Sequence, residues 1–232
     1  SLYPSIMLAK NISPDVDSSI PKILTRLLTE REKYRALRMS GESTSSDDTT
    51  EQSLKYIANS VYGVMASPYF KLYDLKCASL ITSTGRDIVK KCSDILEENG
   101  FTVIYNDTDS TFIKDVSTLD DAYKLERIVN TSLLEWARQH HIKDEFAPIV
   151  KFEKFYKTLF FKKRAGISNE AARKKYVGHL IWKDGKEKSQ IDYTGIEIKR
   201  SDTAPYTKEI MEQFFKSVLI DGEVEDAVNG VR

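Results

Sequence analysis

The chain has 232 residues, with 35 lysines and arginines against 35 aspartates and glutamates and a hydrophobic fraction of 41%. This composition predicts one large or two small soluble domains, and without a run of about 18 apolar residues it predicts no membrane-spanning helix and no membrane partner. The chain opens on Ser1 without a signal-peptide pattern, so we expect a piece of a longer protein. The two cysteines, Cys77 and Cys92, are not spaced as metal ligands, and we expect reduced thiols in an intracellular protein.

Three helices are predicted in the first hundred residues. Residues 21–39 repeat apolar side chains at helical spacing, behind a proline suited to a first turn. Residues 40–50 are small, polar and acidic, without a side chain able to anchor a core, and predict a mobile loop. A second helix over residues 50–62 would form an antiparallel pair with the first, and a third is predicted over residues 78–99.

The stretch "VIYNDTDSTFI", residues 103–113, predicts a β-hairpin. β-Branched and aromatic residues flank a polar centre that favours a turn, with its tip at residues 107–110. In an extended chain Asp107 and Asp109 would share a face about 7 Å apart and repel by roughly 2 to 3 kcal/mol at an effective dielectric of about 20. A hard divalent cation such as Mg²⁺ would relieve that repulsion. The alternative is an acidic turn that faces water.

The second half of the chain predicts a helix, a basic β-rich region and a last helix. The helices cover residues 119–140 and 204–219, and two strands are expected between residues 149 and 197, joined by a loop at residues 168–172. Residues 151–188 carry twelve lysines and arginines against four acidic residues, a net charge of +8. That local charge favours contact with a polyanion, although the whole chain is neutral.

Cationic side chains recur on the first two predicted helices. Arg31 and Arg35 lie four residues apart, and Lys55, Asn59 and Tyr62 form one polar stripe at i, i+4 and i+7. If both stripes face the same side, three cations and an amide converge on one spot, which an anion such as a triphosphate would occupy. The alternative is an ordinary solvated helix face.

A tyrosine at the start of the chain is a candidate for contact with a sugar. In "SLYPSI", Tyr3 is held by Pro4 and would be able to pack flat under a sugar ring, where it would exclude a 2′-hydroxyl by contact. The alternative is an aromatic residue at the end of a strand.

Taken together, these segments resemble the family B DNA polymerases. "SLYPSI" is similar to the end of that family's motif A, "KYIANSVYG" matches its motif B, K-x-x-x-N-S-x-Y-G, and "YNDTDS" matches motif C, usually Y-G-D-T-D-S. "RKKYVG" at residues 173–178 resembles the primer-gripping K-K-R-Y element, and "GIEIKRSD" at residues 195–202 resembles a G-x-E-x-x-R-x-D stretch. The order and approximate spacing agree over essentially the whole chain.

The resemblance implies an α+β fold: a polymerase palm with an antiparallel sheet and packed helices, a two-helix fingers insertion and the start of a helical thumb. The implied limits are residues 1–19 and 64–200 for the palm, 20–63 for the fingers and 201–232 for the thumb. The implied reaction transfers deoxynucleotides from dNTP to a primer 3′-hydroxyl, with two Mg²⁺ ions, or Mn²⁺ in their place.

The resemblance also implies roles for individual residues. Asp109 would be the essential catalytic residue and metal ligand, with Asp107 its less critical neighbour. Tyr3 would be the steric gate against ribonucleotides. The residues implied at the incoming dNTP are Leu2, Tyr3, Arg31, Arg35, Lys55, Asn59 and Tyr62. Those implied at the DNA are Gly63, Arg173, Lys174, Lys175 and Tyr176. Further partners would be the N-terminal and exonuclease domains of the longer chain and a sliding clamp.

The sequence departs from the family pattern in three places. The family's first catalytic aspartate lies three residues before the serine of "SLYPS", where this chain begins, so we expect the isolated chain to be inactive. Asn106 replaces the commoner glycine of motif C and would adjust the turn. "KKRAG" at residues 162–166 competes with "RKKYVG" as the primer-gripping element, but lacks its tyrosine. Glu153 is a further candidate acid near the metals, or an ion-paired strand residue.

Two rival functions stay open on the sequence alone. Glycosyltransferases also use D-x-D to hold a metal bound to a nucleotide diphosphate, but they have no need of a cationic helix pair followed by a basic β region. A non-catalytic nucleic-acid-binding fragment, or half of a split polymerase, would keep the basic region without carrying out the reaction alone.

Overall fold

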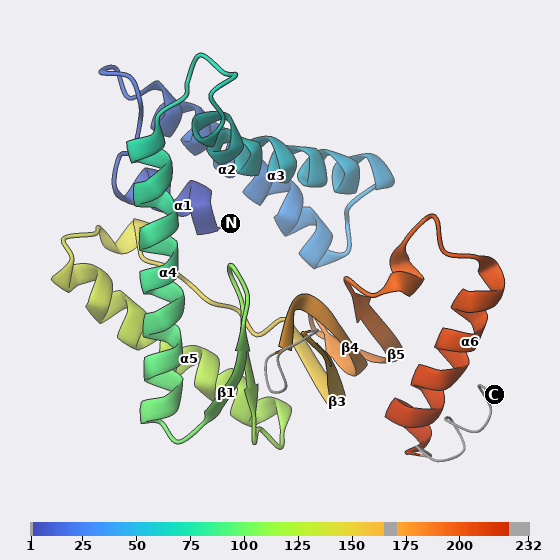
Figure 1. Ribbon diagram of the computed structural model, residues 1–232. Coiled ribbons are helices and arrows are strands. Elements are labelled where there is room, and N and C mark those ends of the chain that lie inside the picture. Colours follow the sequence, from blue (N-terminus) through green and yellow to red (C-terminus); the bar gives the residue numbers. More distant parts are fainter. Residues whose placement is uncertain (1, 165–170, 223–232) are drawn as a thin grey trace. The chain divides into compact units, whose positions relative to one another are not determined.

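A computed structural model describes residues 2–164 and 171–222 (Figure 1). The chain divides into two compact units, Ser1–Val150 and Lys151–Arg232. The first contains α1 (Leu2–Ala9), α2 (Ser19–Ser40), α3 (Ser45–Ala66), α4 (Leu75–Glu98), β1 (Thr102–Asn106), β2 (Thr111–Lys114), α5 (Leu119–Gln139) and the short helix η1 (Asp144–Phe146). The second contains β3 (Lys154–Lys163), β4 (Ala171–Lys183), β5 (Lys186–Thr194), η2 (Glu197–Lys199), α6 (Pro205–Lys216) and η3 (Ser217–Asp221). Helices with antiparallel sheets confirm the predicted α+β class.

The described helices confirm the helical segments expected from apolar periodicity. None of these helices is both long enough and apolar enough to cross a membrane. The start of the chain, however, is the helix α1, so the alternative that Tyr3 ends a strand is wrong.

The predicted mobile loop at residues 40–50 is wrong for most of its length, because only residues 41–44 lie outside the two helices. Helix α2 runs to Ser40, Gly41 caps it at a φ of 79°, and α3 begins at Ser45. The reason is a capping box: the Asp47 amide donates to Thr44 Oγ1 at 3.2 Å, and the Thr44 amide donates to the Asp47 carboxylate at 2.8 Å. Because this box satisfies two of the free backbone groups at the helix start, residues 45–50 are helical, and α3 is longer than the predicted helix at both ends.

The core of the first unit lies between α4, α5 and the helices before them. Ile81, Ile88 and Ile95 recur at helical spacing on α4 and are buried, and Leu125 and Leu133 are buried on α5. Figure 1 shows α4 as a long helix with the β1–β2 hairpin beside it. Because one face of α4 is buried in this core, α4 is held in place, and the hairpin packs against it.

The predicted hairpin is confirmed, with its tip at residues 107–110. Strands β1 and β2 pair antiparallel, and the Asp107 amide donates to the Ser110 carbonyl at 2.9 Å to close the turn. Asn106, which stands where motif C more commonly has glycine, donates from Nδ2 to Ser93 Oγ on α4 at 3.0 Å. This side chain therefore ties the hairpin to α4.

The second unit is a three-stranded antiparallel sheet in the order β3-β4-β5, with α6 and its π-helical extension η3. Two strands were predicted, and β5 is the addition. Ala171 and Ala172, assigned to a loop by the sequence, already belong to β4, while the rest of that predicted loop lies outside the described residues. Val177 of β4 packs with Phe215 and Leu219 in the core of this unit.

A close approach between β3 and β4 depends on a glycine. A Cβ built on Gly178 would lie 2.5 Å from Cδ1 of Tyr156, so the ring occupies the space of a missing side chain.

The Tyr156 hydroxyl donates to Asp192 Oδ2 at 2.6 Å, and Lys154 Nζ lies 2.7 Å from the same oxygen. Burial raises the pKa of Asp192, but the hydrogen bonds from Lys154 and Tyr156 outweigh it and hold that pKa below its usual value.

Candidate functional site

Tyr3 lies where three helices of the first unit meet. Its ring centroid is 4.7 Å from that of Tyr62 on α3, at an interplanar angle of 50°. On α4, a Cβ built on Gly85 would lie 3.2 Å from Tyr3 Cε1 and 3.5 Å from Leu2 Cδ2. Gly85 therefore lets the start of the chain approach α4 closely, and the structure brings together three residues that the sequence assigned to the nucleotide: Leu2, Tyr3 and Tyr62.

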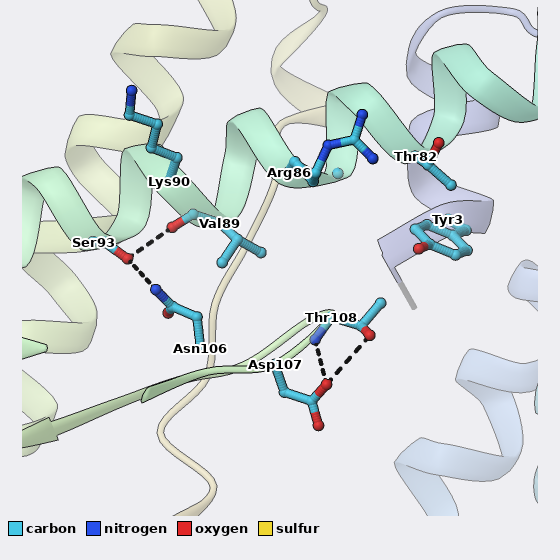
Figure 2. Close-up of a pocket in the computed structure, with 10 residues that line it drawn as sticks. Tyr3, Thr82, Arg86, Val89, Lys90, Ser93, Asn106, Asp107 and Thr108 are labelled. Carbon is cyan, nitrogen blue, oxygen red and sulfur yellow. Dashed lines mark hydrogen bonds between the residues drawn. The ribbon is translucent and has the colours of Figure 1, made fainter. Parts of the chain in front are cut away.

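An open cavity of about 440 Å³ joins Tyr3 to the hairpin tip. Its other lining residues include Asp107 and Thr108 at the tip and two cations on α4, Arg86 and Lys90. Figure 2 shows Tyr3 on the α1 side, the α4 side chains along one wall and Asp107 opposite them. An aromatic ring, a carboxylate and two cations around one open space suit a ligand with an apolar ring and an anionic group.

The two aspartates of the hairpin tip differ in their surroundings. Asp107 is half-buried, and its Oδ1 accepts from the Thr108 amide at 2.7 Å and from Thr108 Oγ1 at 3.3 Å. Figure 2 marks both bonds with dashed lines. Asp109 is exposed and is not one of the described residues that line the cavity. The structure therefore brings Asp107, rather than Asp109, to the cavity wall.

The tip carboxylates fit a magnesium site completed by a substrate. Among the described residues, no group of three or more His, Cys, Asp and Glu side chains is able to hold a metal. Mg²⁺ needs no such cage, because it is commonly held by one or two carboxylates together with substrate phosphates and water. Two carboxylates at an accessible turn match that donor set.

The predicted convergence of cations on α2 and α3 has a feature that the sequence analysis missed. Arg31 Nε donates to Oε1 of Glu51 on α3 at 2.8 Å, and Arg38 reaches the other oxygen of Glu51 at 3.1 Å. The Arg35 guanidinium instead lies 3.3 Å from Glu32 of its own helix. The sequence did contain a signal for Glu51. It lies four residues before Lys55, and residues at i and i+4 share a helix face.

Lys55 and Asn59 continue the face of α3 that carries Glu51. The positions 51, 55, 59 and 62 fall within one stripe of the helix. Lys55 is half-buried and Asn59 is exposed. The stripe thus begins at the Arg31 ion pair and ends at the Tyr62 ring against Tyr3.

The second unit carries the predicted primer-gripping residues on β4. Arg173 and Lys174 are exposed and Lys175 is half-buried. Tyr176 is only 8% exposed, and its ring centroid lies 5.9 Å from that of Phe161, so little of it is accessible for direct contact. The rival element at residues 162–166 lies partly outside the described residues.

Glu197 connects the two basic elements of this sheet. Its Oε1 accepts from Lys162 Nζ at 2.8 Å and lies 3.9 Å from Lys175 Nζ. The hydrogen bond from Lys162 holds the pKa of Glu197 below its usual value. Glu197 lies in the stretch that resembles the family's G-x-E-x-x-R-x-D pattern, but no role was predicted for it from the sequence. Glu153, the candidate further acid, is exposed just before β3 in the same unit.

The comparisons with known proteins agree on one family. The family model described as DNA polymerase family B matches residues 15–232. DNA polymerase 2 of Aeropyrum pernix is 29% identical over 100% of this chain and 29% of its own length. The DNA polymerase delta catalytic subunit of Schizosaccharomyces pombe is 31% identical over 98% of this chain and 24% of its own length. The DNA polymerase alpha catalytic subunit of Arabidopsis thaliana is 29% identical over 100% of this chain and 15% of its own. The chain therefore spans less than a third of each of these relatives.

Proposed function

This chain belongs to DNA polymerase family B, and we propose that it is the core of a template-directed DNA polymerase. The reaction would transfer a deoxynucleotide from dNTP to the 3′-hydroxyl of a primer. The observation that carries the proposal is the shared cavity of Tyr3 and Asp107, two residues about a hundred positions apart in the chain. A nucleotide with its sugar at Tyr3 and its phosphates toward the tip aspartates would use both.

We further propose the palm, fingers and thumb boundaries that the family resemblance implies. Residues 1–19 and 64–200 would form the palm, 20–63 the fingers and 201–232 the start of the thumb. The antiparallel pair α2 and α3 supports the fingers assignment, since it stands as a two-helix insertion between α1 and α4. The tip aspartates and the basic strand β4 would both belong to the palm.

The incoming nucleotide would lie between Tyr3 and the cations of α2 and α3. Tyr3 is braced by Tyr62 and by α4 at Gly85, so its ring has little room to yield to a 2′-hydroxyl, and Leu2 packs beside it. Arg31, Lys55 and Asn59 would hold the triphosphate. Arg35 would join them by exchanging Glu32 for phosphate, because an exposed ion pair of this kind contributes little stability.

Asp107 and Asp109 would hold the metal ions. Two Mg²⁺ ions, when bound, supply activation of the primer hydroxyl and stabilisation of the leaving pyrophosphate. The protein's own contribution is to hold the two carboxylates on a short turn. The Asp107–Ser110 bond closes that turn, and Asn106 fastens it to α4.

Primer-template DNA would contact Gly63 and the cations near the start of β4. Arg173, Lys174 and Lys175 would neutralise backbone phosphates, and such contacts position the duplex without reading its sequence. Tyr176, packed on Phe161, would support β4 from within the sheet.

Single-nucleotide primer extension with Mg²⁺ tests the proposal. The 232-residue chain is compared with a version extended upstream to include the first motif A aspartate, and primer-template binding is measured for both. Incorporation by the extended chain is the expected result, with little or none by the shorter one. If both chains bind primer-template but neither incorporates, the result favours a non-catalytic nucleic-acid-binding role or a requirement for the other domains of the longer protein.

A further inference from the structure

Glu51 is a buried acid between two arginines of the neighbouring helix. It is 1% exposed, and Arg31 and Arg38, two turns apart on α2, bind its two carboxylate oxygens at 2.8 and 3.1 Å. The Arg31 side chain is itself only 11% exposed, whereas that of Arg38 is 50% exposed. Glu51 and Arg31 thus form the buried half of this cluster.

We propose that Glu51 is a positioning residue, which holds the Arg31 guanidinium on the triphosphate-binding face of α3. The inference rests on the proposed function, in which Arg31 and Lys55 bind the triphosphate. Glu51 lies one turn before Lys55 on the same helix face. Because the bond to Glu51 engages Nε, it sets the plane of the guanidinium fork, and a fork must be oriented to meet phosphate oxygens.

The charge of the cluster is consistent with this role. Two arginines share one carboxylate, so the cluster keeps a net charge of +1 next to Lys55. Glu51 therefore anchors Arg31 without cancelling the positive field that attracts an anion. A buried guanidinium deprived of its carboxylate would be left as an uncompensated charge, and we expect Arg31 to turn toward water and lose its alignment.

The test is single-turnover nucleotide incorporation by the complete polymerase that carries this chain, at varied dNTP concentration. Glu51→Gln keeps the shape of the side chain and removes its charge. We expect the apparent Kd for dNTP to rise roughly tenfold, because a misaligned guanidinium would lose about one charge-assisted hydrogen bond to phosphate, with the maximal rate changed by less than about threefold. Glu30→Gln is the matched control: Glu30 pairs with Lys33 on α2 at 2.7 Å, with its side chain 45% exposed, and we expect its apparent Kd to match that of the wild type.

Arg31→Ala and the double variant separate this inference from the proposed function. Arg31→Ala should raise the apparent Kd at least as much as Glu51→Gln, and the double variant should add nothing to Arg31→Ala, since both changes remove one interaction. No change in Arg31→Ala would overturn the role of Arg31 itself. A raised Kd in Arg31→Ala with an unchanged or lowered Kd in folded Glu51→Gln would overturn the positioning role alone, as would fully additive effects.

A second variant covers the case in which Glu51→Gln does not fold. Glu51→Asp keeps the charge but shortens the side chain by one methylene, so it should fold and draw Arg31 out of alignment. We expect an apparent Kd between those of the wild type and Arg31→Ala. A wild-type value for Glu51→Asp, together with a raised one for Arg31→Ala, would contradict the proposal.

Discussion

The carbonyl oxygen of Lys174 occupies the place where a side chain on Gly195 would begin. A Cβ built on Gly195 would lie 2.0 Å from that oxygen, and Gly195 has a φ of 60°. Lys174 also has a positive φ, 56°. Two stretches that the sequence analysis matched separately to the family, "RKKYVG" and "GIEIKRSD", are therefore in contact through their backbones, and the glycine is what allows the contact.

Gly195→Ala should destabilise the protein much more than Gly185→Ala. Both glycines have a positive φ, but a Cβ on Gly185 would meet no atom within 4 Å. Gly185→Ala should therefore cost about 1 kcal/mol, from its backbone conformation alone. Gly195→Ala should cost roughly 3 kcal/mol or more, because steric overlap with Lys174 is added. Denaturant unfolding of both variants measures the difference, and equal losses would contradict the close approach.

The helices were predictable from sequence because each buries one apolar face. Ile81, Ile88 and Ile95 alone indicate the inner side of α4. The predicted loop failed on a local interaction, since the Thr44–Asp47 capping box turns a polar segment into a helix start. That pair has the spacing of a capping box, although with aspartate in place of the usual glutamate or glutamine.

The site was less predictable because its contacts join distant segments. The sequence indicated a cationic stripe on each helix, but the partner of Arg31 lies 20 residues away, and only the packing of α2 on α3 identifies it as Glu51. The cations Arg86 and Lys90 line the same cavity as Tyr3, which Gly85 allows to approach α4 closely. The periodicity of the sequence does not predict a close approach between residues so far apart in the chain.

Removing charge at Lys174 and Lys175 should weaken primer-template binding and flatten its dependence on salt. For every phosphate that the protein no longer neutralises, the slope of log K against log salt should fall by about 1. We expect this of Lys174→Gln and Lys175→Gln, measured by fluorescence anisotropy across a salt series. Lys186→Gln, at the other end of β4 and β5, is the control with the same charge change. An equal effect of all three would mean general attraction rather than contact at β4.

Tyr3→Ala should admit ribonucleotides. Tyr62 and Gly85 hold the ring from two sides, so its removal opens the cavity at the proposed position of the sugar. The ratio of incorporation efficiencies for dNTP and rNTP should fall at least tenfold, which corresponds to a loss of roughly 1.4 kcal/mol or more in the free energy of discrimination. Tyr123→Ala, a partly exposed tyrosine on α5, should leave the ratio unchanged. An unchanged ratio in Tyr3→Ala would remove Tyr3 from the gate.

Asp192→Asn should destabilise the second unit in a pH-dependent way. The pKa of Asp192 is held below its usual value, so its stabilising effect is present above the unfolded pKa of about 3.9 and is lost as the pH falls through the lower folded pKa. We expect a loss of about 1 to 2 kcal/mol at pH 7, because Tyr156 and Lys154 lose a charged partner. The difference from the wild type should shrink below about pH 4.

Asp202→Asn, which removes an exposed pair with Arg200, should change stability little at either pH. A loss at Asp192 that does not vary with pH would rule out this ion pair as its cause.

Asp109→Asn should abolish nucleotide incorporation and spare primer-template binding. Asparagine keeps the size of the side chain but removes the charge that a divalent cation needs from its ligand. Asp107→Asn should be less severe, as the family resemblance implies, even though Asp107 is the residue on the cavity wall. Single-nucleotide extension with Mg²⁺ and a parallel binding assay measure both effects. Asp115→Asn, an exposed carboxylate just after β2, is the control and should leave the rate unchanged. Incorporation near the wild-type rate by Asp109→Asn would exclude Asp109 as a metal ligand. A larger loss at Asp107 would instead make the cavity-lining carboxylate the principal one.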